Sequence, residues 1–220
     1  RAPEFLAWLF NESPVKDMVA INDRWGKETR NVHGGFATPE YGHIPQGRLI
    51  DAGLWEECQG MGASFGYNRN ENVDDYRTST QLLHLLIDTV SRGGNLLLDI
   101  GPTADGRIPV IMQQRLVDMG EWLDRNGEAI YGTAKWRESK EGEAIRFTAK
   151  DSAVYAICSE WPGAELRLTT PKPSAATTVT MLGREGNLEF AAQDGALVIK
   201  TPPLSPQDKH AYVFKLTGVE

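Results

Sequence analysis

The chain has 220 residues, of which 40% are hydrophobic and 24% charged, as in a soluble globular protein with room for one large domain or two modest ones. The formal net charge of −7 argues against nucleic acid as a partner, because phosphate binding needs clustered Lys and Arg. No segment approaches the roughly 18 apolar residues of a membrane span, and residues 1–10 lack the features of a signal peptide. We therefore expect no membrane partner, while the sequence does not indicate a compartment.

The first part of the chain alternates between helical and strand patterns. Apolar residues at helical spacing predict helices at about residues 3–11, 79–92 and 109–127, with Ser79 as a possible N-cap and Gly93 beyond the end of the second helix. Short apolar runs predict strands at residues 17–23, 63–68 and 95–102. The stretch from 26 to 60 is rich in Gly, Pro and aromatic residues, and a loop of that length is usually functional.

From about residue 130 the pattern changes to short alternating runs separated by Gly, Pro and Asp. The predicted strands are EAIRFTA, AVYAICSEW, ELRLTT, TVTML, LEFAA, ALVIKT and AYVFKLTG. Short strands at roughly ten-residue spacing are typical of a β-sandwich, whereas alternating helices and strands are typical of β/α folds. Three strands are too few to close a barrel. We therefore predict an incomplete (partial) β/α barrel at residues 1–129 and a C-terminal β-sandwich at 130–220.

Polar and aromatic clusters follow the predicted strands at residues 22–26, 64–71 and 99–109. Loops after the strands of β/α folds build the active site, so these clusters indicate a pocket, although Asp, Asn and Gly also simply make turns. Rings beside charged groups suit a sugar, which has both hydroxyls and an apolar face. Trp25, Phe65 and Tyr67 are therefore expected to bind substrate, with core packing as the alternative for Trp25 and Phe65.

Glu40 lies in HGGFATPEYGHIPQG, close to aromatic residues that we expect to raise its pKa. Glycoside hydrolysis needs a protonated carboxyl to assist the leaving group and a second carboxylate that attacks the sugar or activates water. Glu40 is thus the first choice for the proton donor, with a solvated loop glutamate as the alternative reading. Cys58, Cys158 and the four histidines show no metal-ligand spacing, and no cofactor motif occurs, so neither a metal nor a cofactor is expected.

At these residues the sequence resembles the α-L-fucosidases of glycoside hydrolase family 29. The segments that carry the resemblance are PEFLAWLFNESPVKD, INDRWG, HGGF, LWEECQGMGASFGYNRNE, LLHLLIDTVSRGGNLLLDIGPTADGRI and GEWLDRNGEAIYGT. The resemblance implies a retaining enzyme that removes α-L-fucose from glycans. It implies that Glu40 is the acid/base, that Arg24 contacts the sugar and that Phe65 faces the fucose methyl group, with Glu56 as the alternative acid/base.

The chain also departs from the family pattern. The family's nucleophile is an aspartate in a motif that precedes the first helix of this chain, and that motif does not occur here. Asp99 stands where the family usually has Asn, which places an extra carboxylate near the expected pocket, although a neutral change from Asn to Asp is the other reading. A second carboxylate would come from Asp99, Asp23 or Glu56, or from another copy of the chain in a homo-oligomer that covers the incomplete barrel.

Three functions remain open from the sequence. The first is an active α-L-fucosidase acting on fucosylated glycans or fucosides. The second is a non-catalytic glycan-binding remnant, or a fragment of a longer enzyme, which binds sugar weakly through Arg24 and Phe65. A carbohydrate-binding role for the sandwich alone is weaker, because the stretches with the character of a sugar site precede residue 110.

Overall fold

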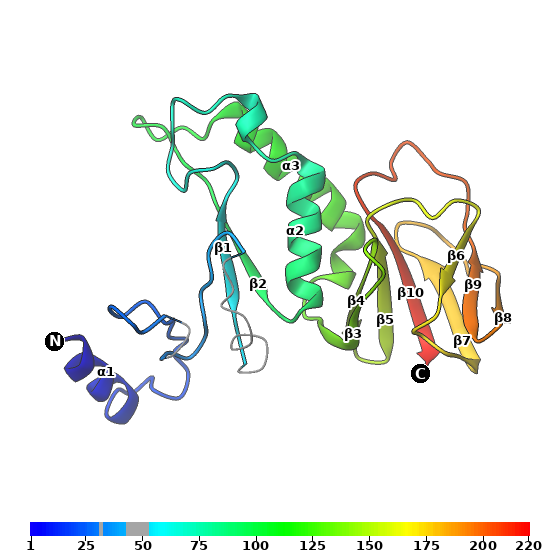
Figure 1. Cartoon of the computed structure of the whole chain (residues 1–220), viewed down its shortest axis with the longest axis horizontal. Helices are drawn as coiled ribbons and strands as arrows, with labels where there is room; N and C mark the ends of the chain where they lie inside the picture. Colours follow the sequence, from blue (N-terminus) through cyan, green and yellow to red (C-terminus); the bar gives the residue numbers. More distant parts are fainter. Residues whose placement is uncertain (31–32, 43–52) are drawn as a thin grey trace. The chain divides into compact units, whose positions relative to one another are not determined.

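The computed structural model describes residues 1–30, 33–42 and 53–220 (Figure 1). The chain forms two compact units. The first unit contains residues 1–59 and 94–98, and the second contains residues 60–93 and 99–220. Residues 43–47 of the HGGFATPEYGHIPQG stretch lie outside the described residues.

The first unit contains the predicted N-terminal helix as α1 (Ala2–Asn11), together with most of a two-stranded sheet of β1 (Glu56–Gly60) and β2 (Asn95–Asp99). The prediction of β2 is confirmed, whereas β1 lies in the stretch that we predicted to be a loop. Trp55, which precedes β1, is only 2% exposed. Gly94 lies against its ring so closely that a Cβ atom there would come within 2.5 Å of it, which explains the glycine.

The prediction of a strand at residues 17–23 is wrong. Residues 17–23 instead form a turn and an irregular segment, with Met18 87% exposed. The carbonyl of Ile21 accepts hydrogen bonds from the backbone N–H groups of Gly35 and Phe36, at 2.7 and 3.2 Å, so the backbone is paired locally rather than in a ladder. The run is apolar, as a strand requires, but within the described ranges no strand pairs with residues 17–23.

The prediction of a strand at residues 63–68 is also wrong, because these residues form a series of bends. The side chain of Asn68 donates to Ser64 Oγ at 3.1 Å, a local bond that competes with strand pairing. A short 3₁₀ helix, η1 (Val73–Asp75), follows.

The two remaining predicted helices are confirmed as α2 (Ser79–Ser91) and α3 (Val110–Asn126). The N-cap of α2 is Thr78 rather than Ser79: its hydroxyl accepts from Gln81 N, and the Gln81 side chain accepts from Thr78 N, which makes a capping box. Gly93 follows the helix with a φ of 82°, a left-handed conformation that favours glycine. A 3₁₀ helix, η2 (Gly127–Ala129), ends the helical part.

The C-terminal residues form a β-sandwich of two antiparallel sheets. The five-stranded sheet has the order β3-β4-β5-β10-β7, and the three-stranded sheet has the order β6-β9-β8. The strands are β3 (Ala134–Glu141), β4 (Ile145–Lys150), β5 (Ala153–Cys158), β6 (Glu165–Leu168), β7 (Pro173–Met181), β8 (Phe190–Gln193), β9 (Ala196–Lys200) and β10 (Tyr212–Val219). All seven predicted runs contain a strand, while β3, which is rich in charged residues, was missed.

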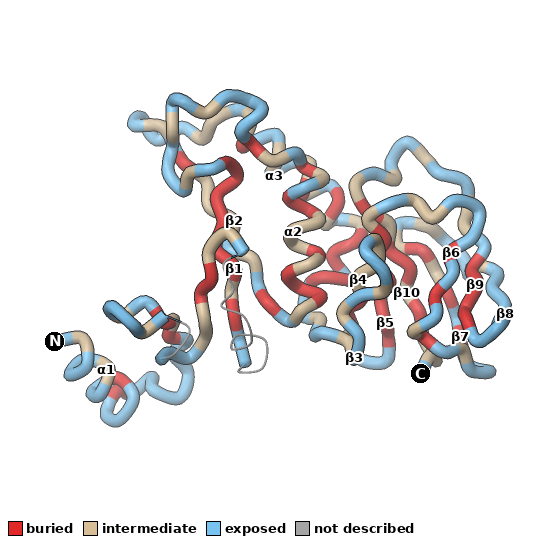
Figure 2. Tube along the Cα trace, viewed as in Figure 1, coloured by how far each residue is buried: buried red, intermediate tan, exposed pale blue. Residues whose placement is uncertain are grey.

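Both faces of the five-stranded sheet are covered within the second unit. One face packs on the other sheet around side chains that include Phe147, Leu197 and Phe214, each 0% exposed. On the opposite face, Thr148 Oγ1 donates to the carbonyl of Ala129 at 2.8 Å, and Tyr155 OH donates to Glu128 at 2.8 Å. Every residue of β5 is consequently buried, as Figure 2 shows.

Helices α2 and α3 belong to the same compact unit as the sandwich. Trp122 Nε1 of α3 donates to the carbonyl of Ala211 at 3.0 Å, and Arg146 Nε forms an ion pair with Asp88 of α2 at 2.8 Å. The predicted boundary between the barrel domain and the sandwich domain, at residues 129 and 130, falls directly after η2 and remains a proposal.

Candidate active site

Glu40 lies at the end of a short extended segment that runs beside β1. Isolated parallel bridges join Ala37 to Trp55 and Glu40 to Cys58. The backbone N–H of Cys58 donates to the carbonyl of Pro39 at 2.9 Å, and Tyr41 N donates to the Cys58 carbonyl at 3.3 Å. Sheet pairing therefore fixes the backbone on both sides of Glu40.

Thr38 is the centre of a buried polar network next to this segment. Its hydroxyl donates to Asp23 Oδ1 at 2.5 Å and accepts from Arg24 Nε at 2.7 Å. Its carbonyl accepts from Arg24 Nη2 at 3.2 Å and from Arg30 Nη2 at 2.7 Å. Thr38 and Asp23 are 2% and 1% exposed, so the network holds both guanidinium groups in place from the protein side.

Arg24 and Arg30 together hold the carboxylate of Glu40. Arg24 Nη1 donates to Glu40 Oε1, and Arg30 Nη1 lies 3.5 Å from Glu40 Oε2. The hydrogen bond from Arg24 and the positive charges of the two guanidinium groups hold the pKa of Glu40 below its ordinary value. Our expectation that nearby aromatic rings raise this pKa is wrong, because the arginines dominate. The Glu40 side chain is 28% exposed, so solvent reaches the pair.

The alternative carboxylates near Glu40 differ in their surroundings. Asp23 is almost fully buried and accepts both the hydroxyl and the backbone N–H of Thr38, which is an anchoring role. Glu56 is half-buried at the start of β1. Cys58 lies near both Arg24 and Glu56, and burial raises the pKa of its thiol, which keeps the sulfur protonated at neutral pH.

Trp25 packs on α1 instead of standing free in a loop. Its ring stacks on Phe5, with centroids 5.6 Å apart and an interplanar angle of 29°. Its indole Nε1 is buried and meets no acceptor in the described part of the chain. The packing alternative is therefore realised, and contact of Trp25 with a substrate stays a prediction.

The other predicted site residues, Phe65, Tyr67 and Asp99, belong to the second unit. The Phe65 and Tyr67 side chains are exposed, at 36% and 44%. Their loop packs tightly on the segment after β2: a Cβ atom on Gly101 would come within 2.3 Å of the backbone nitrogen of Tyr67. The two exposed rings thus lie on a loop held next to the segment that follows Asp99, which is itself half-buried at the end of β2.

Sequence reasoning missed three residues of this region. Arg30 was not recognised as a second cation on Glu40, and Thr38 was not recognised as the network's centre. Glu57 is 1% exposed and accepts a hydrogen bond from the backbone N–H of Gly42, whereas only its neighbour Glu56 was singled out. The alternation of a strand through EECQG would have separated the two glutamates, but that stretch was predicted to be a loop.

Across residues 1–30, 33–42 and 53–220, no group of three or more His, Cys, Asp or Glu side chains is arranged to hold a metal ion. In the same ranges, none of the helices has the length and apolar character that a membrane crossing requires.

Comparison with known proteins places these features in a family. The family model described as alpha-L-fucosidase matches residues 1–128, and the model of the alpha-L-fucosidase C-terminal domain matches residues 138–217. Tissue alpha-L-fucosidase of Homo sapiens is 42% identical over 224 residues, covering 98% of this chain and 48% of that protein. The alpha-L-fucosidase of Branchiostoma floridae is 41% identical over 223 residues, covering 98% of this chain and 49% of that protein.

Solved structures agree in fold. The alpha-fucosidase of Thermotoga maritima in complex with a mechanism based inhibitor superposes with a TM-score of 0.79 at 34% identity, covering 97% of this chain and 48% of that one. The same enzyme in complex with fucose gives a TM-score of 0.77 at 33% identity, with the same coverage.

The matches also fix the fold class. The predicted partial β/α barrel followed by a β-sandwich is confirmed by solved fucosidases that share the fold and by the separate family model for the C-terminal domain. The chain spans about half the length of the relatives it matches. The chain belongs to the α-L-fucosidase family, glycoside hydrolase family 29.

Proposed function

We propose that the protein is a retaining α-L-fucosidase, a hydrolase that releases α-L-fucose from fucosylated glycans or fucosides. The observation that carries the proposal is the glutamate at the end of a strand-like segment, with two arginines fixed around it by a buried threonine and aspartate. Family membership and the fucose complex of a relative support the substrate class. A pair of cations beside a carboxylate suits a neutral sugar, whose hydroxyls accept from Arg and donate to Glu.

In this proposal Glu40 acts twice. It donates a proton to the glycosidic oxygen while a second carboxylate attacks the anomeric carbon, and it then removes a proton from the water that hydrolyses the glycosyl ester. The second carboxylate comes from Asp99, Asp23 or Glu56, or from another chain. Among these, the burial and occupied oxygens of Asp23 disfavour attack by Asp23 on a substrate.

The two roles of Glu40 place opposite demands on its pKa. The bond from Arg24 favours the carboxylate, which suits the base step but opposes donation of a proton. A sugar hydroxyl that accepts from Arg24 would compete with Glu40 for the guanidinium and so raise the pKa of the glutamate. Arg24 thereby both binds the sugar and couples binding to the protonation of the acid.

The test replaces Glu40 by Gln and measures turnover of an aryl α-L-fucoside. We expect Glu40→Gln to lower kcat/KM by about 10² to 10⁴, the usual contribution of a positioned acid or base. Glu12→Gln, which changes an exposed glutamate of the same unit, is the matched control and should leave turnover unchanged. Equal activity of the Glu40 variant and the wild type would remove Glu40 from the mechanism.

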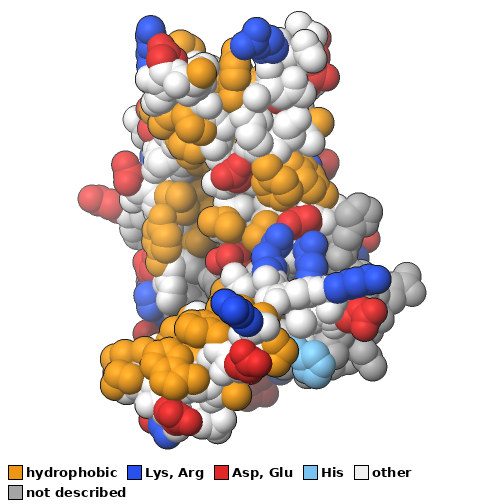
Figure 3. Space-filling model, turned by 90° about the vertical axis from the view of Figure 1, so that its left-hand side faces the viewer, with side chains coloured by type: hydrophobic (Ala, Val, Ile, Leu, Met, Phe, Trp, Pro, Cys, Tyr) orange, Lys and Arg blue, Asp and Glu red, His pale blue; other side chains and the backbone are white. Residues whose placement is uncertain are grey.

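Self-association is the second part of the proposal, and the exposed apolar face of α1 supports it. Phe5, Trp8 and Phe10 are 45–49% exposed, and Figure 3 shows hydrophobic side chains gathered on one face of the molecule. Apolar patches of this kind usually mark an interface. We expect the mass in solution to exceed that of one chain and Trp8→Glu to reduce it. A monomeric wild type would overturn self-association as part of the proposal.

A non-catalytic role is the other candidate, favoured by the match to only about half of each relative. A glycan-binding remnant or fragment would bind fucose weakly without hydrolysing fucosides. Activity of the purified chain, measured together with fucose binding, separates the two functions.

A further inference from the structure

Glu57 is a buried carboxylate beside the candidate site that the proposed mechanism does not use. It is 1% exposed, and Oε1 accepts from the backbone N–H of Gly42 at 2.7 Å and from Gln59 Nε2 at 2.8 Å. Oε2 meets no donor in the part of the chain that the structure describes. A buried carboxylate needs such hydrogen bonds to offset the loss of hydration, so its position is fixed by the groups it accepts from.

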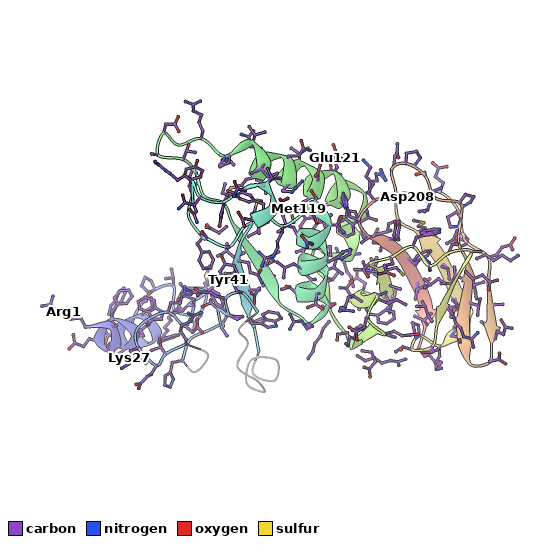
Figure 4. The ribbon with its side chains drawn as sticks, turned by 45° about the horizontal axis from the view of Figure 1, so that its top comes forward. Arg1, Lys27, Tyr41, Met119, Glu121 and Asp208 are labelled. Atoms are coloured by element: carbon purple, nitrogen blue, oxygen red, sulfur yellow. The ribbon has the colours of Figure 1, made fainter. Side chains whose placement is uncertain are left out.

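Gly42 belongs to the turn that directly follows Glu40. Tyr41 and Gly42 both have left-handed backbones, with φ of 51° and 73°. A tyrosine rarely adopts this conformation without support from its surroundings. The backbone N–H of Tyr41, which is labelled in Figure 4, donates to the Cys58 carbonyl of β1 at 3.3 Å. The next N–H, that of Gly42, makes the shorter bond to Glu57 at 2.7 Å.

The direction of the Glu57 side chain separates it from the substrate side. Side chains alternate along a strand, so Glu57 and Gln59 lie on the face opposite to Cys58. Cys58 is the bridge partner of Glu40 and therefore shares its face. Glu57 thus reaches the reacting glutamate only through the backbone of the turn.

We propose that Glu57 is a positioning residue that holds the turn after Glu40 and thereby keeps the Glu40 carboxyl aimed at the leaving-group oxygen. The inference rests on the proposed role of Glu40 as acid/base. Gln59 completes the arrangement, because its amide donates to the same oxygen and restricts the glutamate side chain.

The catalytic test compares fucosides that differ in their need for an acid. Phenyl α-L-fucoside has a poor leaving group that requires protonation. The 2,4-dinitrophenolate of 2,4-dinitrophenyl α-L-fucoside is a good leaving group and departs without protonation. We expect Glu57→Ala to lower kcat/KM for the phenyl substrate about tenfold or more, and for the dinitrophenyl substrate by less than about twofold. Glu57→Gln keeps an acceptor for Gly42 and should restore most of the phenyl activity. An equal loss on both substrates would show a merely structural role and overturn the proposal.

Glu141 offers a matched control in the sandwich. Its carboxylate also fixes a loop by accepting the backbone N–H groups of Thr169 and Thr170, at 2.7 and 2.9 Å. Glu141→Ala removes the same kind of anchor far along the chain from Glu40. It should leave the ratio of the two kcat/KM values unchanged, and a change in that ratio equal to that of Glu57→Ala would count against a specific role for Glu57.

A second measurement separates this inference from the proposed function. If the wild type hydrolyses neither fucoside, the proposed function fails, while amide hydrogen exchange at Gly42 still reports on the anchor. We expect exchange at Gly42 to rise about tenfold or more in Glu57→Ala and to stay near the wild-type rate in Glu57→Gln. Unchanged exchange in Glu57→Ala would overturn the positioning role whatever the activity.

Discussion

The sandwich and the first unit are stabilised in different ways. The sandwich encloses a continuous apolar core in which Phe147, Leu197 and Phe214 are 0% exposed. The first unit leaves large apolar side chains such as Phe10 and Met18 at 49% and 87% exposure, and it buries a polar network in which Thr38 binds Asp23. Apolar burial is tolerant of detail, whereas a polar network depends on each partner. The candidate site therefore lies where stability depends on directional contacts.

The largest expected effect comes from the sandwich core. Phe214→Ala removes a fully buried ring and should lower the free energy of unfolding by about 3 to 5 kcal/mol, because it leaves a cavity. Phe10→Ala, at a half-exposed position of α1, should lower it by less than about 1 kcal/mol. Urea unfolding followed by circular dichroism measures both. Equal losses would mean that the apolar face of α1 is covered in solution.

A smaller effect is expected from the polar network. Thr38→Val keeps the shape but removes the hydroxyl that joins Asp23 to Arg24, and it should destabilise the first unit by about 1 to 3 kcal/mol. Hydrogen exchange of the amides in residues 20–30 and 33–42 measures this local stability.

The sandwich provides the control for this change. Thr178 and Thr217 share an exposed hydroxyl pair at 2.6 Å, and Thr178→Val should change stability by no more than about 0.5 kcal/mol. If the two valine variants behaved alike, burial of the Thr38 network would not be the source of its strength.

The same comparison explains what the sequence predicted. Short apolar runs such as AVYAICSEW and ALVIKT located β5 and β9, because strands that are buried along nearly their whole length are apolar at successive positions. The charged strand β3 lacks this signal and was missed. In the first part of the chain, an apolar run at 17–23 predicted a strand where the structure has none, since an isolated run does not specify its pairing partner.

The candidate site was predicted residue by residue but not as a network. The family resemblance drew attention to Glu40 and Arg24, and the structure brings these two side chains together. The role of Thr38 depends on a contact with Arg24, 14 residues away, and the burial of Glu57 depends on a contact with Gly42, 15 residues away. No local pattern encodes such contacts. The direction of the Glu40 pKa shift was missed for the same reason, because Arg24 is distant in sequence and adjacent in space.

The smallest expected effect concerns pH. Because Arg24 and Arg30 hold the pKa of Glu40 below its ordinary value of 4.5, the pair stabilises the folded state above that pH, and the contribution is lost as the pH falls through the lowered pKa. Glu40→Gln should therefore destabilise the first unit at pH 7, by no more than about 1 kcal/mol since the pair is partly solvated, and the difference should vanish in acid. Exchange rates near Thr38, measured between pH 3 and 7 and corrected for intrinsic chemistry, test this. A difference between variant and wild type that grew in acid would reverse the sign of the interaction. The pKa of Glu40 would then be raised, as a proton donor requires, and the arginines would bind the sugar rather than the glutamate.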